Sequence, residues 1–208
     1  MSCSIEVKNL SYKVDGKILF KNINFKLTHK DKIGIIGPNG VGKTTLLKII
    51  ANLKKPFTGE VLITPNHTLG FLFQDPEDQL IYPTVLEDVA FGLINKGVKK
   101  EEAKERSLLM LEKLGISHLK DKIVFKLSGG EKKLTALAGI LITEPDILLL
   151  DEPSTALDDY YTKKIIEILQ GIDKTMLIVS HDIEFTKKIV HSFYLLTPEG
   201  FKKGMNFE

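Results

Sequence analysis

Residues 37–44 constrain the fold of this 208-residue chain more than any other segment. Their sequence, Gly-Pro-Asn-Gly-Val-Gly-Lys-Thr, matches the pattern G-x-x-x-x-G-K-[ST]. A short apolar run at 32–36 precedes them, and residues 44–53 carry apolar side chains at helical spacing. In such a strand–loop–helix unit, glycines let backbone N–H groups turn inward while the helix directs its positive end at the same point. The segment therefore predicts a phosphate-binding loop in an α/β fold.

Two side chains at the end of this loop have the chemistry that a nucleotide requires. Lys43 would reach the β and γ phosphates, and the Thr44 hydroxyl could ligate Mg²⁺. A chance match in a glycine-rich turn is the alternative, but the strand expected before the loop and the helix expected after it favour a nucleotide site. The loop alone leaves a kinase, a GTPase and an ATPase open.

A carboxylate pair follows the apolar run Ile-Leu-Leu-Leu at 147–150, which is typical of a parallel strand buried on both faces. Asp151 ends this run and could hold Mg²⁺ directly or through water. Glu152 could then polarise an attacking water as the general base. An isolated Asp-Glu pair would be interpreted more simply as the start of a helix. The loop at 37–44 makes the hydrolytic interpretation the better one.

Residues 127–131, Leu-Ser-Gly-Gly-Glu, form a second glycine-containing helix start. Ser128, Gly129 and Gly130 could hold an anion at the positive end of that helix. A capped helix start is the simpler alternative. A second phosphate cradle has no use in a single-site kinase. It makes sense if two chains pair head-to-tail and each lends its cradle to the γ-phosphate of the other.

The remaining pattern predicts one α/β domain over residues 1–208, with an inserted helical subdomain at about 83–130. Alternating residues at 4–28, interrupted by Asp15-Gly16, predict an antiparallel edge sheet with a hairpin. The other elements expected are strands at 60–63, 69–73 and 176–179 and helices from Gly130 and over 160–169. After His181 we expect one helix and a terminal hairpin, without a long C-terminal extension.

Composition excludes some classes of function. The formal net charge of +2 gives no electrostatic reason to expect a nucleic-acid surface. The one cysteine, Cys3, cannot form an internal disulfide. No apolar run reaches the ~20 residues that span a bilayer. Any role at a membrane is therefore expected to come through a partner.

In their order along the chain, these motifs resemble those of an ATP-binding cassette (ABC) transporter ATPase, which is a P-loop NTPase with a mixed core sheet. Residues 37–45 resemble the Walker A motif, and residues 147–152 resemble Walker B with its catalytic glutamate. Residues 127–131 resemble the signature LSGGQ, with Glu131 in place of glutamine, and residues 155–158 resemble the D-loop. The resemblance implies an ATP hydrolase that uses Mg²⁺ and pairs head-to-tail with a second ABC ATPase, identical or different.

The resemblance also implies roles for single residues. Gln74 and His181 would join Glu152 as catalytic residues, and Gln74 would contact Mg²⁺ together with Thr44 and Asp151. Tyr12 would stack on adenine, and Glu131 is expected to face solvent or a basic neighbour. The further residues implied to contact the nucleotide are Asn39, Gly40, Gly42, Lys43, Thr44, Thr45, Ser128, Gly129, Gly130 and Asp158.

Residues 73–92 resemble more specifically the ATPases of energy-coupling-factor (ECF) importers, including the cobalt/nickel type. The resemblance implies that arginines of a transmembrane scaffold dock near Asp75, Glu77 and Asp78. A substrate-binding membrane subunit would be engaged indirectly, and the chain would lie at the cytoplasmic face of the membrane, powering import of a metal ion or vitamin. The alternatives are the ATPase of another ABC transporter type and a soluble ABC ATPase that does not serve transport.

Overall fold

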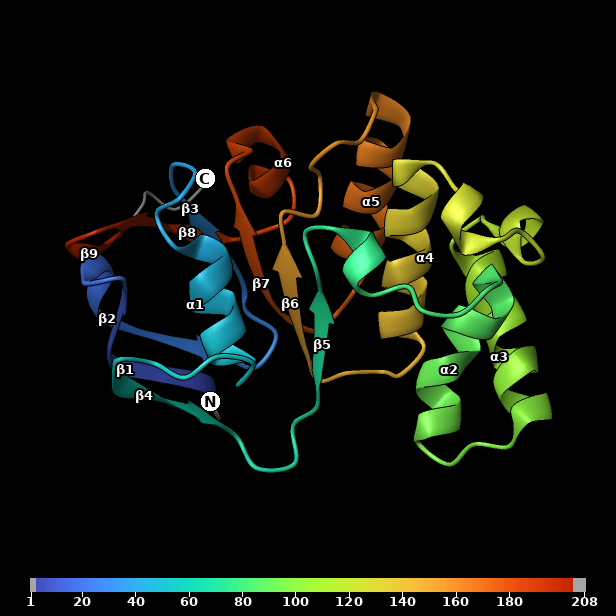
Figure 1. Ribbon diagram of the computed structural model, residues 1–208, viewed down its shortest axis with the longest axis horizontal. Helices are drawn as coiled ribbons and strands as arrows, with labels where there is room; N and C mark the ends of the chain where they lie inside the picture. Colours follow the sequence, from blue (N-terminus) through green and yellow to red (C-terminus); the bar gives the residue numbers. More distant parts are fainter. Residues whose placement is uncertain (1–2, 204–208) are drawn as a thin grey trace.

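The computed structural model describes residues 3–203, which form two sheets flanked by helices (Figure 1). One sheet is three-stranded with the order β2-β1-β4, and the other is six-stranded with the order β5-β6-β7-β3-β8-β9. The strands are β1 (Cys3–Val14), β2 (Lys17–Thr28), β3 (Lys32–Ile36), β4 (Thr58–Ile63), β5 (Leu69–Leu72), β6 (Ile147–Asp151), β7 (Thr175–Ser180), β8 (Ser192–Thr197) and β9 (Gly200–Lys203). The large sheet is parallel from β5 to β8, and β9 pairs antiparallel with β8.

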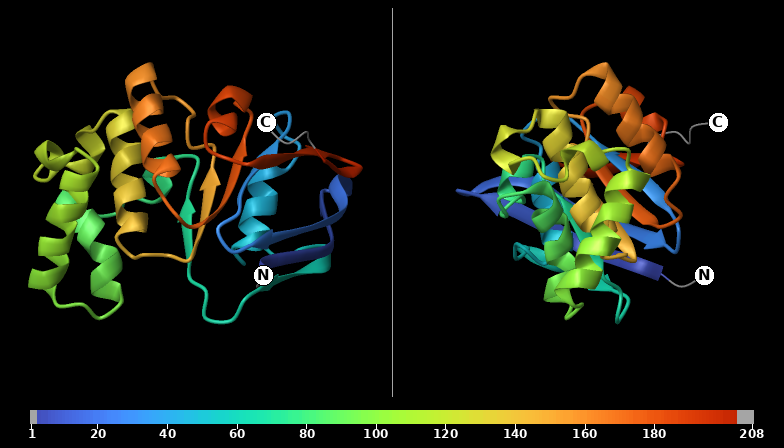
Figure 2. Two further views of the ribbon diagram at one scale, coloured as in Figure 1. Left: turned by 180° about the vertical axis from the view of Figure 1, so that it is seen from behind. Right: turned by 90° about the vertical axis from the view of Figure 1, so that its right-hand side faces the viewer.

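The helices lie against the sheets and at one end of the molecule (Figures 1 and 2). Those described are α1 (Lys43–Ile50), α2 (Val85–Asn95), α3 (Lys100–Lys113), α4 (Gly129–Leu141), α5 (Asp159–Gln170) and α6 (Ile183–Lys187), with 3₁₀ turns η1 (Pro76–Asp78), η2 (Ser117–Leu119) and η3 (Val124–Lys126). Figures 1 and 2 show α2 and α3 together at one end, away from α1 and the three-stranded sheet. The inserted helical segment expected from the sequence is therefore present.

The central strands supply two hydrophobic cores, because successive side chains of a strand point to opposite faces of the sheet. Ile147 and Leu149 of β6 pack into the core that contains α1 and the three-stranded sheet. Leu148 and Leu150 pack into the core on the other face, with α2 to α5. All four side chains are fully buried, which is why the sequence reads as a continuous apolar run.

The predicted elements are found, with shifted bounds. Asp15 and Gly16 both have positive φ, 49° and 79°, as a two-residue hairpin turn between β1 and β2 requires. The helix expected over 44–53 begins at Lys43 and already ends at Ile50. Asn52 lies just beyond that end with φ 58°, a left-handed conformation that terminates a helix. Within residues 3–203, no helix has the length and apolar character needed to cross a membrane.

Candidate nucleotide site

The loop after β3 is built to bring backbone N–H groups together. β3 is buried and lies between β7 and β8 in the parallel sheet, so the loop emerges at the carboxyl edge, where ligands bind in such sheets. Gly40 and Gly42 have φ of 79° and 105°. Gly42 is the N-cap of α1 and contributes no side-chain hydrogen bond, and the first turn contains no acidic residue. The start of α1 is therefore an open, electropositive helix terminus.

Gly42 is also required by close packing. A Cβ at this position would lie 3.0 Å from the Phe20 ring, in addition to the strain of its positive φ. Phe20 is fully buried, so its ring has little room to move. β2 thus supports the loop from behind and fixes its conformation.

A cavity of about 440 Å³ lies over this loop and collects residues from distant parts of the sequence. Lys43 donates hydrogen bonds from its ammonium to the carbonyls of Gly37 (2.9 Å) and Pro38 (3.3 Å), and the same nitrogen lies 3.4 Å from a Glu152 carboxylate oxygen. The cavity is lined by Leu19, Asn39, Gly40, Gly42, Lys43, Thr44, Thr45, Gln74, Glu152, Thr155 and His181. The structure therefore brings the predicted loop, glutamine, glutamate and histidine to one place.

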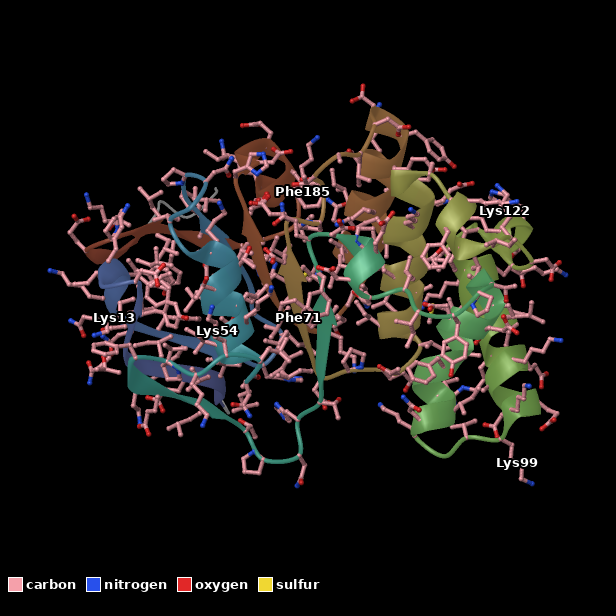
Figure 3. The ribbon with its side chains drawn as sticks, viewed as in Figure 1. Lys13, Lys54, Phe71, Lys99, Lys122 and Phe185 are labelled. Carbon is pink, nitrogen blue, oxygen red and sulfur yellow. The ribbon has the colours of Figure 1, made fainter. Side chains whose placement is uncertain are left out.

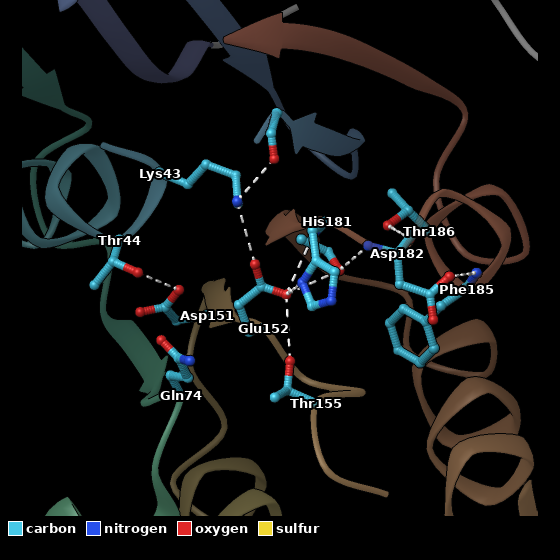
Figure 4. A network of polar contacts seen from close by, with 12 residues as sticks. Lys43, Thr44, Gln74, Asp151, Glu152, Thr155, His181, Asp182, Phe185 and Thr186 are labelled. Atoms are coloured by element: carbon cyan, nitrogen blue, oxygen red, sulfur yellow. Dashed lines mark hydrogen bonds and ion pairs between the residues drawn. The ribbon is translucent and has the colours of Figure 1, made fainter. Parts of the chain in front are cut away.

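Glu152 is held in a single orientation (Figure 4). Its Oε2 accepts hydrogen bonds from the Ser180 hydroxyl (3.2 Å) and the His181 backbone N–H (3.2 Å). The same oxygen lies 2.8 Å from Nδ1 of the His181 ring, and the Thr155 hydroxyl donates to it at 3.4 Å. Glu152 is 5% exposed and has φ 47°, a strained conformation for a residue with a side chain. The fixed carboxylate faces the loop at the end of β6.

Asp151 and Thr44 meet beside it. The Thr44 hydroxyl donates to Oδ1 of Asp151 at 2.9 Å, and Asp151 is buried. Burial raises the pKa of the Asp151 carboxyl and the neighbouring Glu152 adds to the effect, while the Thr44 hydrogen bond opposes it. A cation would relieve this cost, and a hydroxyl with a carboxylate is an oxygen ligand set that suits Mg²⁺. Among residues 3–203, no cluster of three or more His, Cys, Asp or Glu side chains could hold a metal ion.

Gln74 lies just beyond β5, with its side-chain amide close to Asp151 and Thr44 (Figure 4). It lines both the cavity over the loop and a neighbouring cavity of about 550 Å³, which also contains Asp151, Gly129 and Lys133. Sequence reasoning did not single out Lys133 or Ser180, and it gave Thr155 only as part of the segment that resembles the D-loop. A serine or threonine near a strand end carries no distinctive sequence signal, and only their position relative to Glu152 makes them part of the site.

Comparison with known proteins agrees with this geometry. A family model described as ABC transporter matches residues 20–155. The chain belongs to the ABC transporter family. It is 40% identical to the energy-coupling factor transporter ATP-binding protein EcfA of Methanothermobacter thermautotrophicus, over 92% of this chain and 67% of that protein. Its identity to EcfA of Methanosphaera stadtmanae is also 40%, over 88% of this chain and 72% of that protein.

Two solved structures of this family share the fold. cbiO1 from Clostridium perfringens, part of the ABC transporter complex cbiONQ, matches with a TM-score of 0.85 and 31% identity over 99% of this chain and 89% of that one. The dimeric structure of a bacterial ABC transporter cassette matches with a TM-score of 0.86 and 30% identity over 98% and 99%. The chain is thus an ABC ATPase that binds and hydrolyses ATP, as the sequence predicted.

The ABC signature segment does not line the cavity over the phosphate-binding loop. Ser128 is the N-cap of α4: its hydroxyl accepts from the Glu131 N–H (3.3 Å), and Glu131 accepts from the Ser128 N–H (2.8 Å). Glu131 also pairs with Lys122 at 3.0 Å, the basic neighbour that was expected. Of the described residues, Ser128 and Gly130 line neither cavity, whereas Gly129 lines the 550 Å³ one. Their nucleotide contacts stay a prediction about a paired chain.

Tyr12 and Asp158, the other ABC positions, have local partners. Tyr12 packs against Phe20 with ring centroids 6.2 Å apart, and the Lys54 ammonium lies 5.0 Å from its centroid. Among residues 3–203, Tyr12 does not line the cavity over the loop, so stacking on adenine stays a prediction. Asp158 caps α5 by accepting from the Tyr161 N–H at 2.9 Å.

The acidic segment after Gln74 is partly neutralised within this ABC chain. Asp75 accepts a hydrogen bond from the Glu77 N–H at 2.9 Å and so caps η1. Glu77 forms an ion pair with Lys132 of α4. Carboxylates this close repel one another unless water or a cation screens them. Lys132 supplies such a cation from the chain itself, which weakens the case for an external one without removing the exposed carboxylates.

Proposed function

We propose that this ABC ATPase powers the import of a small solute, a metal ion or a vitamin, as the ATPase subunit of an ECF-type transporter at the cytoplasmic face of the membrane. The observation that carries the catalytic part is the meeting of Lys43, Gln74 and the Glu152–His181 pair in one cavity over an open helix start. The names of the relatives, EcfA and a part of cbiONQ, support the transport part.

The residues around the cavity would have different roles in hydrolysis. The loop N–H groups and the Lys43 ammonium would hold the phosphates. Thr44, Asp151 and Gln74 would hold Mg²⁺, which when bound neutralises phosphate charge. Glu152 would take a proton from the attacking water, and His181, fixed against Glu152, would face the γ-phosphate. The strained backbone and the donors on its Oε2 keep the Glu152 carboxylate aimed at the loop.

A second cassette would complete the site. Ser128, Gly129, Gly130 and Asp158 do not line the cavity that contains Lys43, so they would act on the nucleotide of a partner ABC ATPase, identical or different. The dimeric cassette that shares this fold supports such a pairing. With Glu152→Gln blocking turnover, bound ATP should shift the chain toward dimers by mass action.

The surface beside the acidic segment would receive the transmembrane scaffold. Four exposed apolar side chains lie where two segments run side by side: Thr84 bridges Ile123, and the Val124 N–H donates to the Pro83 carbonyl at 3.0 Å. These side chains are Ile81, Tyr82, Ile123 and Phe125. A mixed apolar and acidic surface suits a basic, amphipathic cytoplasmic helix of a membrane protein. Asp88 is buried under it and accepts from the Ile81 and Tyr82 N–H groups, which holds the loop in shape.

The catalytic assignment is tested with Glu152→Gln. Loss of the general base should reduce turnover by at least about a hundredfold while ATP still binds. An ATPase assay and a binding titration on the same preparation separate the two effects. Hydrolysis at the normal rate would reject Glu152 as the base.

The transport assignment is tested by co-purification from detergent-solubilised membranes. Glu77→Ala with Asp78→Ala, and separately Phe125→Ser, should detach the ATPase from an integral membrane partner while leaving soluble ATPase activity nearly unchanged. Leu109→Ser is the matched control, since Leu109 is also exposed (60%, against 69% for Phe125) but lies on α3. If the wild type brings down no membrane protein, a soluble ABC ATPase becomes the better interpretation. If the variants still co-purify, the partner docks elsewhere.

A further inference from the structure

A buried lysine in α4 contacts the main chain that carries Gln74. Lys133 is 1% exposed, one of the largest fully buried side chains of the described structure. Its ammonium donates to the Gln74 carbonyl at 2.5 Å and lies 3.4 Å from the Phe73 carbonyl. Burial lowers the pKa of Lys133 to about 8, opposed by the carboxylates of Asp151, Asp75 and Glu152. A charge buried at this cost requires partners that are themselves fixed.

The Phe73 and Gln74 carbonyls belong to a connecting segment, which the Lys133 ammonium holds in place. β5 ends at Leu72, so Phe73 and Gln74 follow its last residue, and the next regular element, η1, begins at Pro76. Gln74 lines both cavities, and its amide lies near Asp151 and Thr44 (Figure 4). Lys133 lines only the second of these two cavities, and its ammonium contacts the backbone of the glutamine.

We propose that Lys133 is a positioning residue, which fixes the Gln74 backbone so that the Gln74 amide stays within reach of a cation held by Thr44 and Asp151. This inference rests on the proposed role of Gln74 as a Mg²⁺ ligand. Lys133 follows Ser128 by five residues in the same helix, so it also ties the position of Gln74 to the helix that begins with the signature segment.

The direction of the effect separates positioning from electrostatics. The Lys133 ammonium is close enough to Asp151 to lower the pKa of that carboxyl. If only this charge were removed, the site would therefore attract a divalent cation more strongly. Loss of positioning would do the opposite and raise the Mg²⁺ concentration that the protein needs. Residues that orient a metal ligand typically change metal affinity by about 10- to 100-fold when they are replaced.

The test measures binding of a fluorescent ATP analogue as Mg²⁺ is titrated. Lys133→Met should leave binding without Mg²⁺ nearly unchanged and raise the half-saturating Mg²⁺ concentration about 10-fold or more. Lys133→Arg keeps a charged donor and should restore most of the response. Lys32→Met is the matched control, because Lys32 is also buried and donates to two carbonyls, those of Leu169 (2.9 Å) and Gln170 (3.0 Å), at the end of α5. It should lower thermal stability without moving the Mg²⁺ titration.

Gln74→Ala completes the experiment. The single variant should raise the Mg²⁺ requirement, and adding Lys133→Met to it should cause no further change. If Gln74→Ala has no effect, the Mg²⁺ role of Gln74 is rejected and the inference falls with it. If Gln74→Ala has its effect but Lys133→Met leaves the requirement unchanged or lowers it, the inference alone is wrong. Should Lys133→Met not fold, Lys133→Gln, which keeps a shorter donor, takes its place with the same criteria.

Discussion

The starts of α1 and α4 are both rich in glycine, yet they differ in their N-cap hydrogen bonds and in the charge of their first turn. At α1 the N-cap is Gly42, which offers no side-chain acceptor, and no acidic residue follows in the first turn. At α4 a capping box between Ser128 and Glu131 satisfies one N–H of the first turn, and Glu131 adds negative charge. The α1 start is thus open to an anion of its own, whereas the α4 start already has one N–H satisfied and a carboxylate beside it. An anion at α4 would need further groups to hold it, which fits a site shared with a second chain.

The two starts also need glycine for different reasons. Gly42 has a left-handed φ of 105°, a conformation that side chains resist. At Gly130 the reason is space, because an added Cβ would lie 2.3 Å from the ring of Tyr161. Figure 3 shows Lys122, the ion-pair partner of Glu131, on the helical side of the molecule, far from Lys54 beside α1.

The largest expected effect tests which start holds the nucleotide. Lys43→Met removes the ammonium beside the open α1 start and should weaken ATP binding by about 2–5 kcal/mol, the range for removing one partner of a buried charged pair. Lys132→Met, beside the α4 start, should leave ATP binding by the isolated chain unchanged. A binding titration compares both variants. Equal losses would mean that both helix starts contribute within one chain.

A medium effect tests the role of space at α4. Gly130→Ala should destabilise the protein by about 1–3 kcal/mol, the usual cost of overpacking, without altering ATP binding by the isolated chain. At Gly129 the nearest atom to an added Cβ is the Ala156 carbonyl oxygen at 3.6 Å, an ordinary contact. Gly129→Ala should therefore be neutral or gain up to about 1 kcal/mol from helix propensity. Chemical denaturation measures both, and a smaller loss for Gly130→Ala than for Gly129→Ala would contradict the packing argument.

The smallest effect concerns the charge of Glu131. Burial acts to raise the pKa of this carboxyl, but the Ser128 N–H and Lys122 together outweigh it and hold the pKa below its usual 4.5. The carboxylate therefore contributes stability that is present above pH 4.5 and lost as the pH falls through the folded-state pKa. Glu131→Gln should cost at most about 1 kcal/mol at neutral pH, because its partner Lys122 is half-exposed and solvent screens the pair. Denaturation curves of both proteins should converge at acid pH, and a gap that widened there would show the sign to be wrong.

The sequence predicts the regular parts of the molecule well because they depend on local pattern. The hairpin at Asp15-Gly16, the strand ending at Asp151 and the loop at 37–44 all have short-range signals, and the structure places them as expected. Contacts between distant segments carry no such signal. Lys132 and Lys133 are adjacent and chemically identical, yet one pairs with Glu77 near the surface and the other is buried beneath Gln74. Their difference arises from the packing of α4 against residues 73–78, which periodicity alone does not contain.

The order of strands in the large sheet has a consequence for the time course of folding. β3 leads into the phosphate-binding loop and is made early, but its neighbours are β7 and β8, formed by residues 175–180 and 192–197. During synthesis, about 140 further residues must therefore be added before either edge of β3 can be paired. An unpaired apolar strand is prone to wrong association, so this segment is where we expect nascent chains to depend most on chaperones. The nucleotide site would then be among the last parts to form, and ATP could bind only a chain whose central sheet is already closed.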